Sequence, residues 1–331
     1  MKQGKYRMSW GFDFSHINLI PRKCIVDSRS ECDTSINLGD RIFGLPVVPA
    51  NMECVINDEI AIKLAENNFF YIHHRFNVDA VEFTKKMRAL QLPVSISIGV
   101  NEDAYKIVDT LMGSLELGID YVTIDIAHGH CEKMEKIIKY IKKFEYGPFI
   151  IAGNVSTPEA VRDLELWGAN AIKVGIGPGA ACTTYVATGF GSRGSQASAI
   201  KICSEARNNP TTRIIADGGI KEPGDIAKSL VLGADMVMIG GMFSALNDSP
   251  GQTVTGTDGR LYKEFWGSAS AFQSGKKNRI EGTKKLMLMK HHGVLDEMAY
   301  VKECLQSAIS YGGGSTLHCF RLVNYLTKLS H

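Results

Sequence analysis

The 331-residue sequence lacks the features that mark membrane, secreted and nucleic-acid-binding proteins. No apolar run approaches the roughly 20 residues that span a bilayer, and residues 1–20 contain no apolar signal core. Lys and Arg number 37 against 35 Asp and Glu, so the formal charge of +2 provides no basic tail or strong field for nucleic acid. The eight cysteines include no C-x-x-C pair, which argues against a disulfide scaffold or a zinc knuckle. We therefore expect a reduced, cytoplasmic enzyme.

The chain also has no Pro/Ser-rich linker, low-complexity tract or shift in composition that would divide it. We therefore expect residues 1–331 to form a single domain. Glycine is the one excess, at 33 residues, which is about 10% against a typical value of roughly 7%.

Eight short apolar runs, each closed by glycine or a small polar cluster, alternate with segments of helical period. The runs are continuous rather than alternating, which is typical of parallel strands that are buried on both faces. This pattern predicts an α/β fold, a (β/α)₈ TIM barrel. The alternative is an open doubly wound sheet, and the missing G-x-G-x-x-G after the first run disfavours it. The runs begin at Leu45, Phe69, Val94, Tyr121, Phe149, Ala171, Ile214 and Met236.

Two connections are longer than the rest. After the run from Ala171, residues 178–196 delay the next helix, and after the run from Met236 roughly fifty residues precede the last helix near Glu297. In a barrel both would emerge at the carboxyl ends of strands six and eight, where active sites lie. We therefore predict a catalytic loop after strand six. Residues 261–287 are predicted to form a flap over the substrate, with a disordered insertion as the alternative.

The first long connection begins with GIGPGAACTT, which contains Cys182. Glycines permit non-standard backbone there, and nearby amide dipoles raise the thiolate fraction of a cysteine. Cys182 is therefore the candidate nucleophile, while a buried, inert thiol is the alternative and our expectation for the other seven cysteines. Two alternatives are open for Thr183 and Thr184 beside it: they relay protons, or their hydroxyls only form hydrogen bonds that stabilise the turn.

Two glycine pairs close strands seven and eight, in Asp217-Gly218-Gly219 and Gly240-Gly241. Their amides occupy the usual phosphate position of such barrels. Asp217 would repel phosphate but can accept hydrogen bonds from a ribose diol, so a ribose 5′-phosphate is predicted; two tight turns are the alternative.

Other polar residues are weaker candidates. Asp125 ends strand four and is a candidate ligand contact, since carboxylates rarely lie there without a partner. Glu281, amid lysines, is by itself more typical of a solvated surface charge. His73-His74 and His128-Gly129-His130 have ligand-like spacing, but adjacent positions at a strand end point to opposite faces and no carboxylate triad accompanies them, so a transition-metal site is not expected.

Together these residues resemble the IMP dehydrogenase / GMP reductase family, over about Phe12 to Leu326. The similarity includes LPVVPANM, IDIAHGH, KVGIGPGAACTT, ADGGI, GADMVMIGG and LYKEFWGSASAFQ. It is closer to the reductase branch. Dehydrogenases of the family usually insert a regulatory domain after the second strand, whereas here FFYIHHR runs directly into the next helix. They also activate water with an Arg-Tyr pair in the flap, where this chain has KKNRIEG.

The resemblance implies NADPH-dependent reductive deamination of GMP to IMP and ammonia, as part of purine nucleotide salvage. Cys182 would form a covalent thioimidate, and Thr184 and Glu281 would handle protons for the departing ammonia. The alternatives are an IMP dehydrogenase lacking the regulatory domain and a catalytically silent purine-nucleotide-binding barrel. Two departures from the family pattern are Tyr185, where relatives commonly have a basic residue, and Ala180, where many have serine.

The resemblance also implies contacts residue by residue, a homotetramer and a K⁺ ion. Carbonyls of Gly177, Gly179 and Cys182 resemble the family's potassium site. The phosphate would be held at Gly218, Gly219, Gly240 and Gly241, the ribose at Asp217, and the flap side of the nucleotide at Gly267, Ser268, Ala269 and Arg279. Cofactor contacts are implied at Ser28, Arg29, Asp125, Ile126, Ala127, Tyr311 and Gly312, of which the stretch around Tyr311 can come from a neighbouring subunit.

Overall fold

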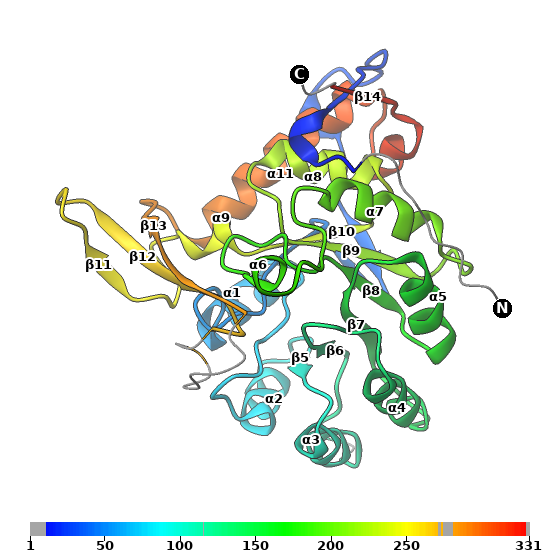
Figure 1. Ribbon diagram of the computed structural model, residues 1–331, viewed down its shortest axis with the longest axis vertical. Coiled ribbons are helices and arrows are strands. Elements are labelled where there is room, and N and C mark those ends of the chain that lie inside the picture. Colours follow the sequence, from blue (N-terminus) through cyan, green and yellow to red (C-terminus); the bar gives the residue numbers. More distant parts are fainter. Residues whose placement is uncertain (1–10, 115, 271–272, 274–280, 329–331) are drawn as a thin grey trace.

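A computed structural model describes residues 11–114, 116–270, 273 and 281–328. Its central feature is a curled sheet of seven parallel strands with helices packed on the outside (Figure 1). The barrel-type α/β fold predicted from the apolar runs is confirmed. In sheet order the strands are β4 (Val47–Pro49), β10 (Met236–Ile239), β9 (Arg213–Asp217), β8 (Ala171–Val174), β7 (Phe149–Val155), β6 (Tyr121–Asp125) and β5 (Ser95–Ile98).

The run that begins at Phe69 differs from the other seven. It makes one parallel bridge, between His73 and Ile96, and the His73 amide donates to the Ser95 carbonyl at 3.1 Å. Phe70 and Ile72 nevertheless belong to the same interior cluster as the strand residues. The run therefore lies beside β5 as part of the barrel wall, and side-chain packing rather than a hydrogen-bonded ladder holds it there.

Three of the outer helices begin at a residue whose side chain caps the first turn. Asn57, Asp79 and Thr157 each accept a hydrogen bond from an amide in the following first turn, and Pro158 occupies the first turn after Thr157. Gly168 ends that helix with a φ of +113°, the left-handed conformation that glycine favours. The outer helices are α1 (Asp58–Glu66), α2 (Ala80–Ala89), α3 (Glu102–Met112), α4 (Glu132–Ile141), α5 (Pro158–Trp167), α7 (Gln196–Glu205), α8 (Pro223–Val231) and α11 (Val294–Tyr311).

A hairpin closes the amino end of the barrel. It consists of β2 (Ile36–Leu38) and β3 (Arg41–Phe43), and its Leu38 and Phe43 side chains belong to the interior cluster. The Tyr121 hydroxyl donates to the Leu38 carbonyl at 2.7 Å, which fastens the hairpin to the barrel wall. The opposite, carboxyl end of the strands is thereby left as the open end of the barrel.

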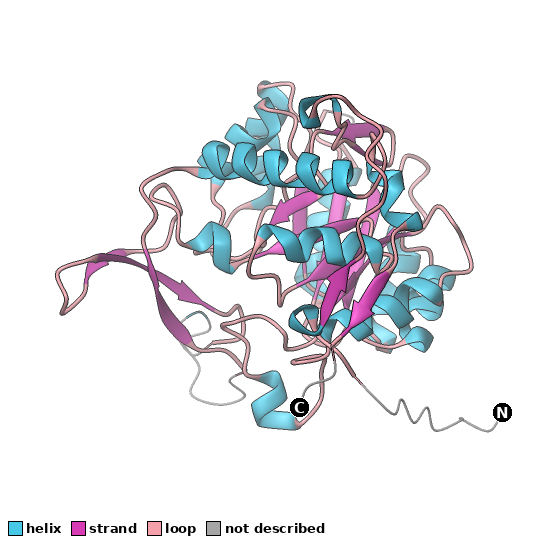
Figure 2. Ribbon diagram, turned by 90° about the horizontal axis from the view of Figure 1, so that it is seen from above, coloured by secondary structure: helices cyan, strands magenta, loops and turns pink. Residues whose placement is uncertain are grey.

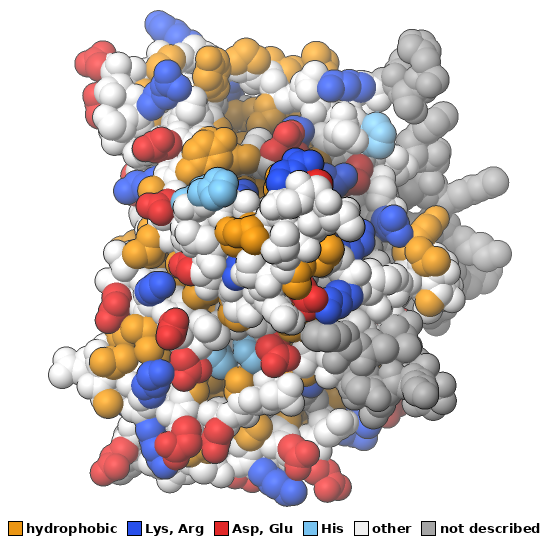
Figure 3. Space-filling model, turned by 90° about the vertical axis from the view of Figure 1, so that its left-hand side faces the viewer, with side chains coloured by type: hydrophobic (Ala, Val, Ile, Leu, Met, Phe, Trp, Pro, Cys, Tyr) orange, Lys and Arg blue, Asp and Glu red, His pale blue; other side chains and the backbone are white. Residues whose placement is uncertain are grey.

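The second long connection forms a small antiparallel sheet. It consists of β11 (Thr253–Thr255), β12 (Leu261–Trp266) and β13 (Lys284–Leu288), and it extends away from the barrel (Figures 1 and 2). The face from which it projects carries basic and acidic side chains intermixed (Figure 3). The short elements are η1 (Phe14–His16), β1 (Ile17–Leu19), η2 (Arg29–Glu31), α6 (Thr184–Thr188), α9 (Gly241–Ser244), η3 (Leu317–Leu322) and β14 (Tyr325–Thr327).

Among the residues that the structure describes, no helix is both long and apolar enough to cross a membrane.

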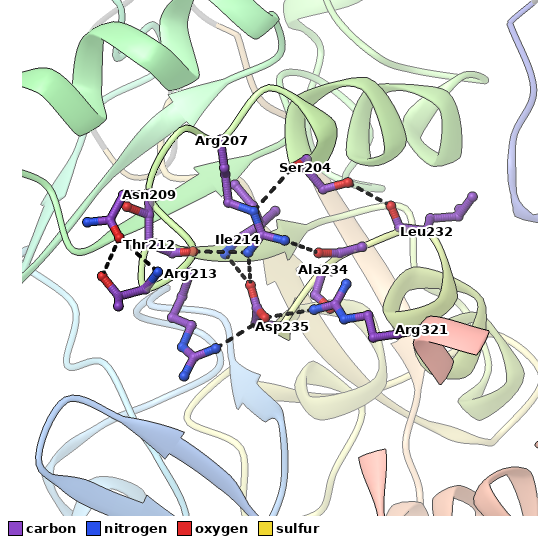
Figure 4. Close-up of polar contacts among 12 residues, drawn as sticks. Ser204, Arg207, Asn209, Thr212, Arg213, Ile214, Leu232, Ala234, Asp235 and Arg321 are labelled. Atoms are coloured by element: carbon purple, nitrogen blue, oxygen red, sulfur yellow. Dashed lines mark hydrogen bonds and ion pairs between the residues drawn. The ribbon is translucent and has the colours of Figure 1, made fainter. Parts of the chain in front are cut away.

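Near the amino ends of β9 and β10, Asp235 forms ion pairs with three arginine side chains (Figure 4). Its carboxylate accepts from Arg207 at 2.7 Å, from Arg321 at 2.8 Å and from the Ile214 amide at 2.8 Å, and Arg213 lies 3.5 Å away. Because Arg321 comes from η3, this cluster ties the C-terminal part of the chain to the barrel.

Replacing Asp235 by Ala should lower the free energy of unfolding by about 1–3 kcal/mol, because hydrogen bonds to a charged, buried partner are lost and three guanidinium groups remain close together. Urea denaturation measures the change. Asp258→Asn is the control, since Asp258 pairs with Arg260 on the surface, where ion pairs contribute little. Equal unfolding midpoints for the two variants would contradict the proposed clamp.

Candidate active site

A cavity of about 890 Å³ lies at the carboxyl ends of the parallel strands. Its wall comes from the ends of β6, β8, β9 and β10 and from the flap, the segment that contains residues 261–287. The structure therefore brings together most of the residues that the sequence singled out. Those that line the cavity are Asp125, Ile126, Ala127, Gly177, Gly179, Cys182, Thr184, Asp217, Gly218, Gly219, Gly240, Gly241, Gly267, Ser268, Ala269 and Glu281.

The loop that carries the candidate nucleophile needs its glycines. Gly175 has a φ of +151°, and a Cβ atom there would lie 1.9 Å from the Asp217 carbonyl oxygen, so no other residue fits. Gly177 has a φ of +80°. The Cys182 amide then donates to the Gly179 carbonyl at 3.1 Å, and α6 begins two residues after the cysteine. This tight path places the half-buried Cys182 side chain at the cavity.

Cys182, Thr184 and Glu281 form a hydrogen-bonded chain. The Cys182 thiol donates to Thr184 Oγ1 at 3.3 Å, and the Thr184 hydroxyl donates to Glu281 Oε2 at 2.5 Å. Glu281 lies 97 positions beyond Thr184 in the sequence, so the flap must be folded over the loop for the contact to exist. Chemically, the arrangement connects a nucleophile through a hydroxyl to a carboxylate that can take its proton.

The two glycine turns expose backbone at the neighbouring part of the cavity wall. Gly218 and Gly219 have φ values of +85° and +81°, which other residues rarely adopt. A Cβ atom at Gly218 would lie 3.0 Å from Pro178 Cγ, so the turn packs directly on the nucleophile loop. Gly240 and Gly241 close β10 beside it. The wall here presents main-chain groups rather than side chains, as an anion site requires.

A buried lysine, which our sequence analysis missed, lies under the cavity. Lys173 on β8 is 1% exposed, and its ammonium group lies 2.8 Å from Asp125 Oδ1 and 3.1 Å from Asp217 Oδ2. The Asn154 side-chain amide also donates to Asp217 Oδ2, at 2.8 Å. Both contacts to Asp217 end on the same oxygen, which leaves its other oxygen for a ligand. The signal was a charged residue within AIKVGIG, a run otherwise typical of a buried strand.

The electrostatics of this trio follow from burial and mutual attraction. Burial alone would raise the pKa of Asp125, but the charge of Lys173 and its hydrogen bond hold that pKa below its ordinary value. Burial likewise acts to lower the pKa of Lys173, and the carboxylates of Asp125 and Asp217 outweigh it, so the pKa is raised. Asp125 and Lys173 are therefore both charged at neutral pH.

The remaining predicted cofactor residues lie elsewhere. Ser28 caps η2, and the Arg29 guanidinium donates to Ser307 Oγ of α11 at 3.1 Å. Tyr311 ends α11 and Gly312 follows it. None of these four lines the cavity, so one chain divides the predicted cofactor contacts into two groups. Arg279 lies outside the described residues.

The histidine pairs have partners of their own. Buried His73 lies 3.1 Å from Asp58 and stacks on Phe83 with ring centroids 4.0 Å apart, and burial lowers its pKa. His130 lies 2.7 Å from Asp163. These contacts explain both side chains as structural.

Fold and cavity together define a (β/α)₈-type barrel with a cysteine-bearing site at the carboxyl ends of its strands. The model for the IMP dehydrogenase / GMP reductase domain matches residues 11–330, and the chain belongs to this family.

Curated relatives cover nearly the whole chain. It is 51% identical over 318 residues to a protein of Mesoplasma florum named GMP reductase, which covers 96% of this chain and 98% of that protein. Proteins named GMP reductase from Bacillus cereus and Bacillus subtilis are each 51% identical over 317 residues, covering 95% of this chain and 94% and 95% of theirs.

Replacing Lys173 by Met should destabilise the protein by about 3 kcal/mol at neutral pH, because two carboxylates lose the cation between them. In the native protein the lowered pKa of Asp125 contributes stability above its unfolded-state pKa, and this contribution is lost as the pH falls through the lower folded-state pKa. The loss caused by the substitution should therefore shrink as the pH falls toward about 4, where carboxylates protonate.

Urea unfolding at neutral and acid pH measures this dependence. Lys263→Met is the matched control, since buried Lys263 donates to the carbonyls of Ser249 and Gly251 instead of joining two carboxylates. Equal losses at both pH values for Lys173→Met would contradict the assignment.

Proposed function

We propose that this protein acts as a GMP reductase, catalysing NADPH-dependent reductive deamination of GMP to IMP and ammonia in purine salvage. The observation that carries the proposal is the hydrogen-bonded chain Cys182–Thr184–Glu281 beside the glycine turns of one cavity. Relatives of the same length that are named GMP reductase support it.

GMP binds with its phosphate at the amides of Gly218, Gly219, Gly240 and Gly241. Asp217 accepts from the ribose hydroxyls through Oδ1, since Oδ2 already receives Lys173 and Asn154. The purine then lies between the nucleophile loop and the flap, where Gly267, Ser268 and Ala269 line the cavity. Arg279 would also contact the nucleotide, as the family resemblance implies. A flap that excludes water protects the covalent intermediate from hydrolysis.

In the first half-reaction the sulfur of Cys182 attacks carbon 2 of the purine. The thiol proton passes through the Thr184 hydroxyl to Glu281, and the same carboxylate gives this one proton to the departing 2-amino group. The carbon–nitrogen bond breaks and ammonia leaves, which produces a thioimidate on Cys182. General acid–base transfer of this kind contributes about 10²–10⁴-fold to rate.

In the second half-reaction a hydride adds to carbon 2, the carbon–sulfur bond breaks, and IMP leaves with Cys182 restored as a thiolate. NADPH supplies the hydride when bound. Asp125, Ile126 and Ala127 line the cavity at the carboxyl end of β6 and would hold the reacting half of the cofactor. Lys173 keeps Asp125 ionised and fixed there.

Ser28, Arg29, Tyr311 and Gly312 would contact the rest of the cofactor from a neighbouring copy of the chain in a homotetramer. Their distance from the cavity wall within one chain, and their shared attachment to α11, support this division.

The carbonyls of Gly177, Gly179 and Cys182 would hold K⁺. Neutral backbone oxygens are the donors that K⁺ takes, and the Gly179 carbonyl keeps a second lone pair beside the one that accepts from the Cys182 amide. Tyr185 supplies no positive charge beside this loop, unlike the basic residue common in relatives.

We further propose that residues 1–331 form one domain without a regulatory insertion, in the cytoplasm. Residues 74–79 alone separate the second barrel segment from α2, which supports the absence of an insertion there. The eight cysteines are free thiols, as in a reducing compartment.

The wild-type protein should oxidise NADPH when GMP is added and release ammonia, as cofactor absorbance and an ammonia assay measure. Cys182→Ser should lose at least about 1000-fold in rate, because the nucleophile is removed, while retaining GMP binding. The control is Cys131→Ser, a substitution at the N-cap of α4, where serine is favoured. Steady NADH formation from IMP, or an active Cys182→Ser variant, would overturn the proposal.

A site shared between copies should show complementation. Arg29→Ala should raise the KM for NADPH, and Cys182→Ser should be inactive. Co-expressed with different tags and purified as mixed oligomers, the two variants should reach about a quarter of the wild-type rate at limiting NADPH if each site combines two chains. A mixture no more active than the average of its parents would place the whole site within one chain.

A further inference from the structure

The flap is joined to the nucleophile loop by backbone pairing. The Thr183 amide donates to the Glu281 carbonyl at 2.9 Å, and the Thr283 amide donates to the Ala181 carbonyl at 2.9 Å. These hydrogen bonds flank an antiparallel bridge centred on Gly282. The residue opposite Gly282 in this bridge is Cys182 itself, so the nucleophile and the flap share one short β-ladder.

The other edge of the same flap segment is also paired. The Glu281 amide donates to the Ala269 carbonyl at 3.0 Å, and the Gly267 amide donates to the Thr283 carbonyl at 3.2 Å. The main chain of Glu281 is therefore held on both sides, by the nucleophile loop and by residues 267–270. Its carboxylate reaches Thr184 from a backbone that has little freedom to move.

Two glycines permit these three backbone segments, residues 181–183, 281–283 and 267–270, to lie so close together. A Cβ atom at Gly282 would lie 2.9 Å from the Ser270 amide nitrogen and 3.3 Å from the Gly267 Cα. A Cβ atom at Gly267 would in turn lie 2.9 Å from the Ala181 carbonyl oxygen and 3.3 Å from the Gly282 Cα. Main-chain atoms cannot move aside as a flexible side chain can, so a methyl group at Gly282 forces the strands apart.

We propose that Gly282 is a positioning residue for the proton-transfer chain. By lacking a side chain it lets the flap pair edge to edge with the nucleophile loop, and this pairing holds the Glu281 carboxylate against Thr184. The proposal rests on the function proposed above and assigns Gly282 no contact with the substrate.

Gly282→Ala tests the proposal. The rate of GMP-dependent NADPH oxidation at saturating GMP should fall about 100-fold, the loss typical of displacing a reacting group by about 1 Å. Gly224→Ala is the matched control, since a Cβ atom there meets nothing within 4 Å, and it should retain the wild-type rate. An unchanged rate for Gly282→Ala would refute the role.

A double-mutant cycle separates positioning from general loss of stability. If Gly282 acts through Glu281, the Glu281→Gln, Gly282→Ala double variant should be no slower than Glu281→Gln alone. Multiplied losses in the double variant would show that Gly282 acts by another route and overturn the proposal. Failure of the wild-type protein to turn over GMP would instead overturn the proposed function.

Hydrogen exchange tests the backbone pairing directly, and its first measurement uses the wild-type protein, so it does not depend on how a variant folds. With GMP bound, the amides of Thr183 and Thr283 should exchange slowly, because each donates to the facing segment. Both should exchange at least about tenfold faster in Gly282→Ala. Unprotected Thr183 and Thr283 amides in the wild-type complex would refute the pairing and the proposal with it.

Discussion

The buried ammonium group of Lys173 is the constraint on which the site depends. A strand covered on both faces must be apolar to be stable, yet β8 carries a lysine at its centre, and a charge there is tolerated only when it is paired. The pairing comes from Asp125 at the end of β6 and Asp217 at the end of β9. Three strands of the barrel are thereby fixed relative to one another at their carboxyl ends. Asp125 and Asp217, which both line the cavity, thus share one buried cation beneath it.

The glycines allow main-chain segments to lie close together around the cavity above Lys173. Gly175 passes so near the Asp217 carbonyl that no side chain fits, and Gly218 packs its turn against the nucleophile loop. Gly267 and Gly282 repeat the arrangement between the flap and that loop. Part of the glycine excess of the sequence is therefore explained by close approach around a single cavity, rather than by flexible loops.

What the sequence could predict follows from how local each signal is. Continuous apolar runs are local signals, and they identified the strands. Glycine-rich turns and Cys182 could be assigned because their chemistry is carried by the residues themselves. The role of Lys173 could not be predicted, because it depends on two carboxylates that lie 48 and 44 positions away in the sequence. The partners of Asp235 are distant in the same way, as is the bridge between Cys182 and Gly282.

The carboxylates of the cavity differ in the partners that hold them, and the difference divides their work. Asp125 and Asp217 both contact the ammonium of Lys173, which holds their side chains in place, and the same cation keeps the pKa of Asp125 low. Both carboxylates are therefore suited to accept hydrogen bonds from bound ligands. Glu281 faces the hydroxyl of Thr184, a group that both accepts and donates a proton. It also lies on the flap, where main-chain hydrogen bonds on both sides hold it beside the nucleophile loop. Under the proposed function, the ligand contacts of Asp125 and Asp217 therefore depend on side chains fixed by the barrel strands, whereas proton transfer depends on how the flap pairs with the nucleophile loop.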